Sequence, residues 1–125
     1  AVVFGDIDLE EHGLWEEKVC NNAGLKLSLP LWKNERRELV TEFISLGFKA
    51  IIVTINEKML NPKFLGRVLS MSLLEELEQQ GVDLCGENGE FHTAVLDGPI
   101  FQRPVTPKIG EVQTHQGYSF LTLTV

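Results

Sequence analysis

The chain has 125 residues, a formal net charge of −7, and 43% hydrophobic and 23% charged residues. This composition, with 2 cysteines and acidic residues in both halves, is typical of a globular protein of the reducing cytoplasm and offers no clustered cations for a nucleic-acid backbone. No apolar run approaches the roughly 18 residues that span a bilayer, so we expect neither a nucleic acid nor a membrane as partner.

The first seventy residues are predicted to alternate between strand and helix. Residues 1–5 and 25–31 are apolar runs that favour strands, and a helix is expected to follow Asp8. Residues 35–46 are predicted to form a second helix. Residues 50–55 are β-branched and apolar on both faces, the pattern of a central parallel strand. Because a buried parallel strand needs neighbours on both sides, we also expect further sequence before the first residue.

The first helix is predicted to begin at Asp8, which has Glu11 three residues later in a capping-box arrangement. One face of this helix has apolar residues at helical spacing, and we expect it to pack inward with its histidine at the boundary. These residues are Leu9, His12, Trp15 and Val19. The acidic side chains are expected to form a solvated face. They are Glu10, Glu11, Glu16 and Glu17.

The pattern changes after residue 56. Residues 72–81 predict a third helix, residues 91–96 alternate like a strand, and residues 110–115 and 118–125 predict a hairpin joined by Gln116 and Gly117. The fold class is therefore α/β. We place a boundary near Lys33 and Asn34: residues 1–33 complete a parallel α/β domain, and residues 34–125 build a smaller α+β domain with a mixed sheet and a C-terminal hairpin.

Three loops at the carboxyl ends of the predicted strands could meet a ligand, since ligands of open α/β sheets collect at that edge. They are residues 5–7, 30–32 and 56–57. Gly5 would let a ligand approach the backbone, and Asp6 would offer a carboxylate to a metal, a ribose or an amine. The alternative is that Gly5 makes a turn and Asp6 helps to cap the helix. Trp32 is either a ligand platform or, as is more frequent, a packed side chain.

The densest polar cluster lies at residues 85–93, with the sequence CGENGEFHT. Its glycines favour a tight turn whose amides could cradle an anion or a carboxylate. The residues expected to contact a substrate here are Cys85, Gly86, Asn88, Gly89 and Thr93. Glu90 and His92 are two residues apart at the start of a strand, so their side chains would share a face suited to proton transfer, with Glu87 nearby.

Other interpretations of this cluster remain open. It could be a plain turn that leads into an edge strand, with Glu87 and Glu90 solvated. If Glu90 and His92 do share a face, Phe91 and Thr93 are expected to point the other way and pack inward. A metal site would need Cys85 with the acidic residues and His92, but the spacing matches no zinc pattern, so we predict no metal site. Cys85 could act as a nucleophile, although a small buried thiol is more frequent.

Arg67 follows an apolar pair and a glycine in the segment Phe64-Leu65-Gly66-Arg67. Its guanidinium could bind the phosphate or carboxylate of a substrate. It could equally pair with a carboxylate of the same domain.

Several motifs in register carry a family resemblance. They are Gly5-Asp6-Ile7, Pro30-Leu31-Trp32, EFISLGFKAIIV at residues 42–53, Phe64-Leu65-Gly66-Arg67, CGENGEFHT at residues 85–93, and Asp97-Gly98-Pro99-Ile100-Phe101. Together they resemble the C-terminal portion of the diphthine–ammonia ligase family, a branch of the PP-loop (N-type) ATP pyrophosphatases. The resemblance covers nearly the whole chain.

This resemblance implies a first domain of HUP type that binds ATP and Mg²⁺, on whose side Gly5 and Asp6 lie. It implies adenylation of a small or protein-borne carboxylate acceptor, from which ammonia then displaces AMP. The turn at residues 85–93 would line the acceptor pocket, with Glu90, His92 and Glu87 catalytic and with Arg67 and Trp32 among the substrate contacts.

The Gly- and Ser-rich phosphate loop of the family does not occur in these residues, so we expect no cofactor to bind this portion alone. The motif Glu-Asn-Gly-Glu-Phe-His differs from the form that eukaryotic members carry. The resemblance therefore does not determine which carboxylate is the acceptor. The alternatives are a non-catalytic binding module and a related enzyme whose acceptor is a nucleobase, stacked on Phe91 and Trp32. A homodimer is one assembly that we consider.

Overall fold

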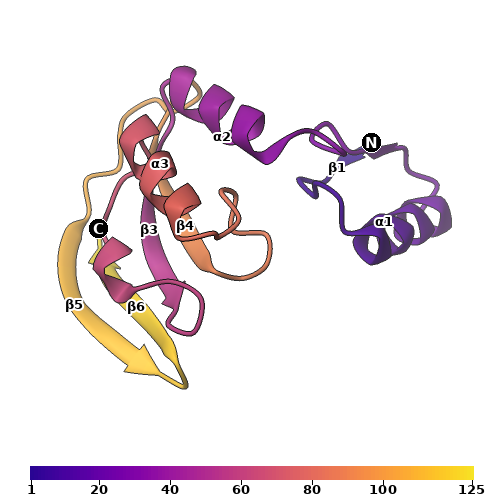
Figure 1. Ribbon diagram of the computed structural model, residues 1–125. Helices are drawn as coiled ribbons and strands as arrows, with labels where there is room; N and C mark the ends of the chain where they lie inside the picture. The colour runs from indigo at the N-terminus through magenta and orange to yellow at the C-terminus, as the bar shows by residue number, and fades with distance from the viewer. The chain divides into compact units, whose positions relative to one another are not determined.

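The computed structural model describes residues 1–125, which form two compact units, Ala1–Glu35 and Arg36–Val125 (Figure 1). None of the helices combines the length and the apolar character that a membrane span requires. The assignment of residues 1–33 to a nucleotide-binding domain and of residues 34–125 to an acceptor-binding domain stays a prediction, as does the HUP type of the first.

The first unit is a small βαβ arrangement. Strand β1 (Val2–Val3) pairs in parallel with β2 (Leu27–Ser28), and helix α1 (Glu10–Asn22) connects them. The predicted strand-helix-strand order is therefore confirmed, but each strand is only 2 residues long where five or more were expected.

Helix α1 corrects two expectations. Its N-cap is Leu9, with no side-chain cap, so the predicted capping box at Asp8 is wrong. The face predicted to pack inward is exposed in this unit: Trp15 is 61% accessible. The side chains of α1 that are buried are Glu16 and Cys20, so Glu16 does not belong to a solvated acidic face.

The second unit contains a four-stranded sheet in the order β4-β3-β6-β5. The strands are β3 (Lys49–Asn56), β4 (Phe91–Asp97), β5 (Lys108–His115) and β6 (Tyr118–Thr124), and every neighbouring pair is antiparallel. The predicted central parallel strand and the mixed sheet are therefore wrong. The apolar character of β3 reflects its central position in the sheet, which says nothing about the direction of its neighbours.

The C-terminal hairpin is confirmed. Strands β5 and β6 meet at a turn in which Gln116 and Gly117 have φ angles of 49° and 80°. Positive φ at both central residues is the type I′ conformation. Two-residue hairpins favour this turn because its twist matches the right-handed twist of the two flanking strands. Strand β5 is an edge strand with all of its residues exposed, and its pairing with β6 is irregular between Ile109 and Val112.

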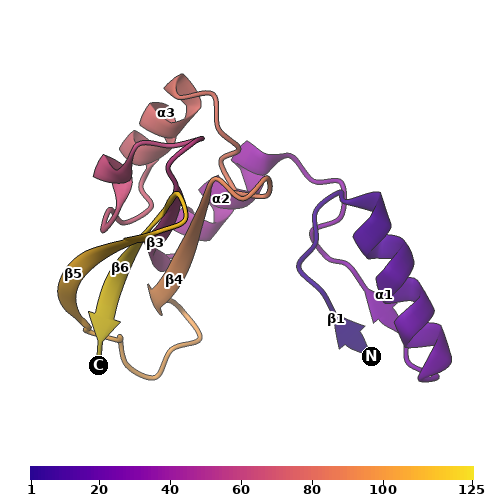
Figure 2. The same ribbon diagram turned by 90° about the horizontal axis from the view of Figure 1, so that it is seen from below.

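Helices α2 (Arg36–Ser45) and α3 (Met71–Gln79) lie on one side of this sheet, with a short 3₁₀ helix, η1 (Pro62–Phe64) (Figure 1, Figure 2). Helix α3 begins after Ser70, whose hydroxyl accepts a hydrogen bond from the Leu73 amide at 3.2 Å. The core joins side chains from the helices, β3 and β4. Its buried members are Val40, Ile52, Ile55, Leu60, Phe64, Leu73, Leu74, Leu77, Leu84 and Phe91.

Candidate functional site

The segment between α3 and β4 is a tight turn that carries most of the predicted site residues. Gly86 and Gly89 have φ angles of 72° and 81°, which only glycine adopts without strain. At residue 86 a Cβ atom would also lie 2.7 Å from the carbonyl oxygen of Phe91. The backbone therefore approaches β4 so closely at this position that no side chain fits.

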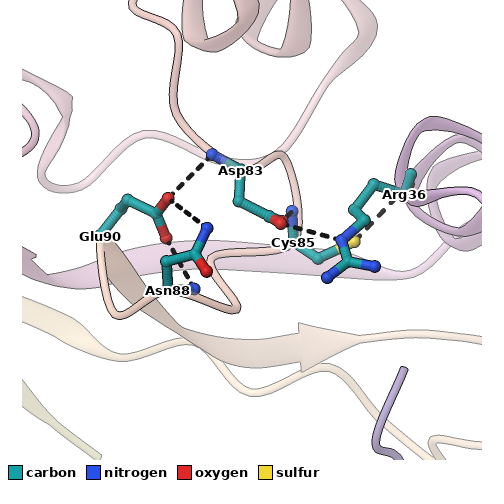
Figure 3. Close-up of polar contacts among 5 residues, drawn as sticks. All are labelled: Arg36, Asp83, Cys85, Asn88 and Glu90. Atoms are coloured by element: carbon teal, nitrogen blue, oxygen red, sulfur yellow. Dashed lines mark hydrogen bonds and ion pairs between the residues drawn. The ribbon is translucent and has the colours of Figure 1, made fainter. Parts of the chain in front are cut away.

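The Glu90 carboxylate holds the turn from within (Figure 3). Glu90 is 2% exposed, and its oxygens accept hydrogen bonds from the backbone amides of Asp83 at 2.9 Å and Asn88 at 3.0 Å. The Asn88 side-chain amide donates a third, longer bond of 3.3 Å. The amides of the turn converge on the chain's own carboxylate, so the predicted contact of this turn with the anion of a substrate stays a prediction.

A second carboxylate ties the turn to the first residue of α2 (Figure 3). Asp83 accepts from the Arg36 Nε at 2.9 Å and from the Cys85 amide at 2.8 Å. The Cys85 thiol donates to the carbonyl oxygen of Arg36 at 3.5 Å. Burial, followed by the negative charges of Asp83 and Glu87, raises the pKa of Cys85 to about 11. Cys85 therefore stays protonated at neutral pH, which disfavours the nucleophile interpretation.

Glu90 and His92 do not converge on one face. Glu90 is buried before the strand begins, whereas His92 is exposed on β4, an edge strand. Thr93 was expected to pack inward with Phe91 but is also exposed. The pairing shifts where His92 faces Thr54 and Thr93 faces Ile52, so β3 carries one extra residue opposite this part of β4. Glu87 is half-buried.

Arg67 pairs with a carboxylate of its own unit. Its two terminal nitrogens donate to the Glu76 oxygens at 2.7 Å and 2.6 Å, and its guanidinium lies 5.5 Å from the centre of the Phe64 ring. The hydrogen bond from Arg67 holds the pKa of Glu76 below its ordinary value. This arrangement corresponds to the structural alternative for Arg67, and its contact with a substrate stays a prediction.

In the first unit, Asp6 lies beside a histidine that the sequence suggested was merely packed. The His12 Nδ1 is 2.7 Å from the Asp6 Oδ1, and both residues line a cavity with Glu16. Trp32 packs against α1, because a Cβ atom at Gly13 would lie only 2.9 Å from the tryptophan ring. Gly5 has no atom near the position of a Cβ, so it leaves open space beside the backbone.

Sequence reasoning missed His12 and Glu16 as members of a polar cluster. The available signal was their spacing of four residues, which places both side chains on one face of a helix. The apolar spacing of Leu9, Trp15 and Val19 obscured it, because it suggested a buried face instead.

Comparison with known proteins adds a family to this geometry. A family model described as the diphthamide synthase C-terminal domain matches residues 35–124. The chain is 36% identical to diphthine–ammonia ligase from Bos taurus over 108 residues, which cover 83% of the chain and 40% of that protein. It is 33% identical to the Homo sapiens protein of that name over 108 residues, with the same coverage of each.

A relative from Saccharomyces cerevisiae, also named diphthine–ammonia ligase, is 34% identical over 119 residues. That match covers 81% of the chain and 17% of the yeast protein. The chain thus spans two fifths or less of the length of these curated relatives.

Proposed function

Because the chain belongs to the diphthamide synthase C-terminal domain family, we propose that it is part of an ATP-dependent ligase that joins ammonia to a carboxylate. Relatives that are 33–36% identical carry the name diphthine–ammonia ligase. In the proposed reaction the carboxylate attacks ATP and releases pyrophosphate. Ammonia then forms the C–N bond as the C–O bond to AMP breaks.

The observation that supports this proposal is the turn between α3 and β4, which internal hydrogen bonds to Glu90 hold in place. This turn lies within the part of the chain that the family model matches. The buried carboxylate of Glu90 and the partly buried carboxylate of Asp83 hold its backbone in one conformation before any ligand arrives. A preorganised surface loses little conformational entropy when it binds a substrate. We therefore assign Glu90 a positioning role and place the contacts to the acceptor on the accessible groups of the same segment, His92, Thr93 and Glu87.

ATP and Mg²⁺ belong to the proposed activity of the full-length protein. Within these 125 residues, Asp6 is a partly exposed carboxylate that already pairs with His12, and there is no Gly- and Ser-rich phosphate loop. One paired carboxylate does not make a Mg²⁺ site, which needs several oxygen ligands. The described residues therefore do not fit a nucleotide site by themselves, and we assign them no step in adenylation.

The nucleobase alternative has less support. It required Phe91 and Trp32 as stacking platforms, but Phe91 is 4% exposed in the core and Trp32 packs on α1. Base stacking needs an accessible aromatic face. A carboxylate acceptor does not depend on these rings.

The test is turnover by the full-length protein with ATP, Mg²⁺, ammonia and candidate carboxylates, including diphthine on its elongation factor. We expect AMP, pyrophosphate and amide in equal amounts. The His92→Ala variant should lower the rate, whereas Glu75→Gln, an exposed change on α3, should not. If no carboxylate elicits AMP and pyrophosphate, the non-catalytic binding module becomes the better proposal.

A further inference from the structure

A cavity of about 400 Å³ in the first unit combines titratable and aromatic side chains, and nothing in the proposed function uses it. It is lined by Phe4, Asp6, His12, Trp15 and Glu16. These residues come from the segment after β1 and from α1. A cavity of this size accommodates a small organic molecule, since ligand pockets begin at roughly 300 Å³.

Glu16 supplies the unusual feature of the cavity. It is 2% exposed, and its Oε2 is buried without any hydrogen-bond partner. Buried polar atoms are nearly always paired, so an unpaired carboxyl oxygen in a cavity wall indicates that a donor is missing. A ligand with an N–H group would supply that donor.

The charge of the surroundings favours a cation. Asp6 presents a carboxylate at the cavity, and His12 holds it in place through the 2.7 Å contact. The hydrogen bond from His12 is the largest influence that lowers the pKa of Asp6, so this carboxylate stays ionised at neutral pH. Burial, followed by a hydrogen bond with Asp6, raises the pKa of Glu16. A cation would therefore meet at least one full negative charge, whereas a phosphate would be repelled.

The walls favour an organic cation over a metal ion. The titratable side chains do not form a set that could hold a metal. Phe4 and Trp15 border the same cavity, and Trp15 is 61% exposed, so its ring has a face that a ligand could cover. Ammonium groups are attracted to aromatic faces as well as to carboxylates. We propose that this cavity is a binding site for a small primary ammonium compound with an apolar body, whose N–H groups bind Glu16 and Asp6.

Binding of benzylammonium to the full-length protein tests the site, and this readout does not depend on ligase activity. The Trp15 indole signal in a nuclear magnetic resonance titration reports occupancy, and the Trp32 indole is the internal control. We expect a Kd of about 1 mM, the strength typical of so small a ligand. Benzyl alcohol, which has the same shape without the charge, should bind at least about tenfold more weakly.

Two matched variants distinguish the role of Glu16 from the effect of removing any acidic side chain of α1. Glu16→Gln keeps the shape but replaces one carboxyl oxygen by an NH₂ group, which cannot accept a hydrogen bond from an ammonium, and should weaken benzylammonium binding about tenfold. Glu17→Gln is an exposed change at the neighbouring position and should leave binding unchanged. Circular dichroism of both variants checks that α1 is retained.

Several results would overturn the proposal. They are the absence of any Trp15 shift with benzylammonium at about ten times the expected Kd, equal binding of benzyl alcohol, and a Glu16→Gln variant that binds as tightly as the parent. A shift of the Trp15 signal by AMP would assign the cavity to a nucleotide and would equally refute an ammonium site.

Discussion

Replacing Glu90 by glutamine separates a bracing role from a catalytic one. The glutamine oxygen can take the place of the Oε1 that accepts from the Asp83 amide, but its NH₂ group then faces the Asn88 amide, which donates at 3.0 Å. One hydrogen bond to a charged group is lost, which costs about 1.5–3 kcal/mol, and a buried donor then faces another donor. We expect the free energy of unfolding of the second unit to fall by about 2–3 kcal/mol.

Urea unfolding followed by circular dichroism measures this loss. For a unit of about 90 residues with an m value near 1 kcal/mol/M, the midpoint should fall by about 2–3 M. Glu75→Gln on α3 removes an exposed carboxylate from the same unit and should leave the midpoint within about 0.3 M of the parent. Turnover of the full-length variants should fall in parallel with the stability of the turn.

The opposite pattern would refute the reasoning. If Glu90→Gln abolished turnover while the urea midpoint stayed unchanged, Glu90 would act on the substrate and the three hydrogen bonds to it would contribute little. If both the urea midpoint and the turnover were unchanged, Glu90 would neither stabilise the turn nor act on the substrate.

Further variants probe the same turn and its neighbours. Gly86→Ala should destabilise the second unit by about 2–4 kcal/mol, because it combines strain at positive φ with a backbone clash, whereas Gly89→Ala, which meets only the strain, should cost about 1 kcal/mol in urea unfolding. In a variant without the other cysteine, alkylation of Cys85 by iodoacetamide should be slow at pH 8 and should accelerate as the pH approaches 11, and fast alkylation at pH 7 would contradict the raised pKa. The hydrogen bond from Arg67 lowers the pKa of Glu76, so the stability from this pair is present above pH 4.5 and is lost as the pH falls through the lowered pKa. The melting temperatures of the parent and Glu76→Gln should therefore differ at neutral pH and converge once the pH lies below that lowered pKa.

The order of the elements followed from local patterns, but the sheet topology did not. The turn at Gln116 and Gly117 was predictable because two residues alone determine a type I′ hairpin. The direction of the strands beside β3 depends on contacts between distant segments, and an apolar run such as residues 50–55 contains no information about that direction. The predicted parallel sheet failed for this reason.

The candidate site shows the same limit. The dense turn at residues 85–93 was predictable from its composition. The positive φ angles of Gly86 and Gly89 explain why glycine occurs at these two positions. What the sequence could not reveal was that Glu90 points inward, because the orientation depends on the amide of Asp83 seven residues earlier. Glu16 was misplaced likewise, since its burial depends on the segment that carries Asp6.

The irregular pairing of β5 has a consequence for behaviour at high protein concentration. Between Ile109 and Val112 this strand advances three residues while β6 advances two. The edge strand β5 therefore contains one extra residue, a β-bulge. Such a bulge twists the edge strand, so a strand of a second molecule cannot pair along its whole length. The charged side chains of Lys108 and Glu111 also oppose the stacking of identical chains. The fold thereby protects its most accessible backbone from growing into fibrils.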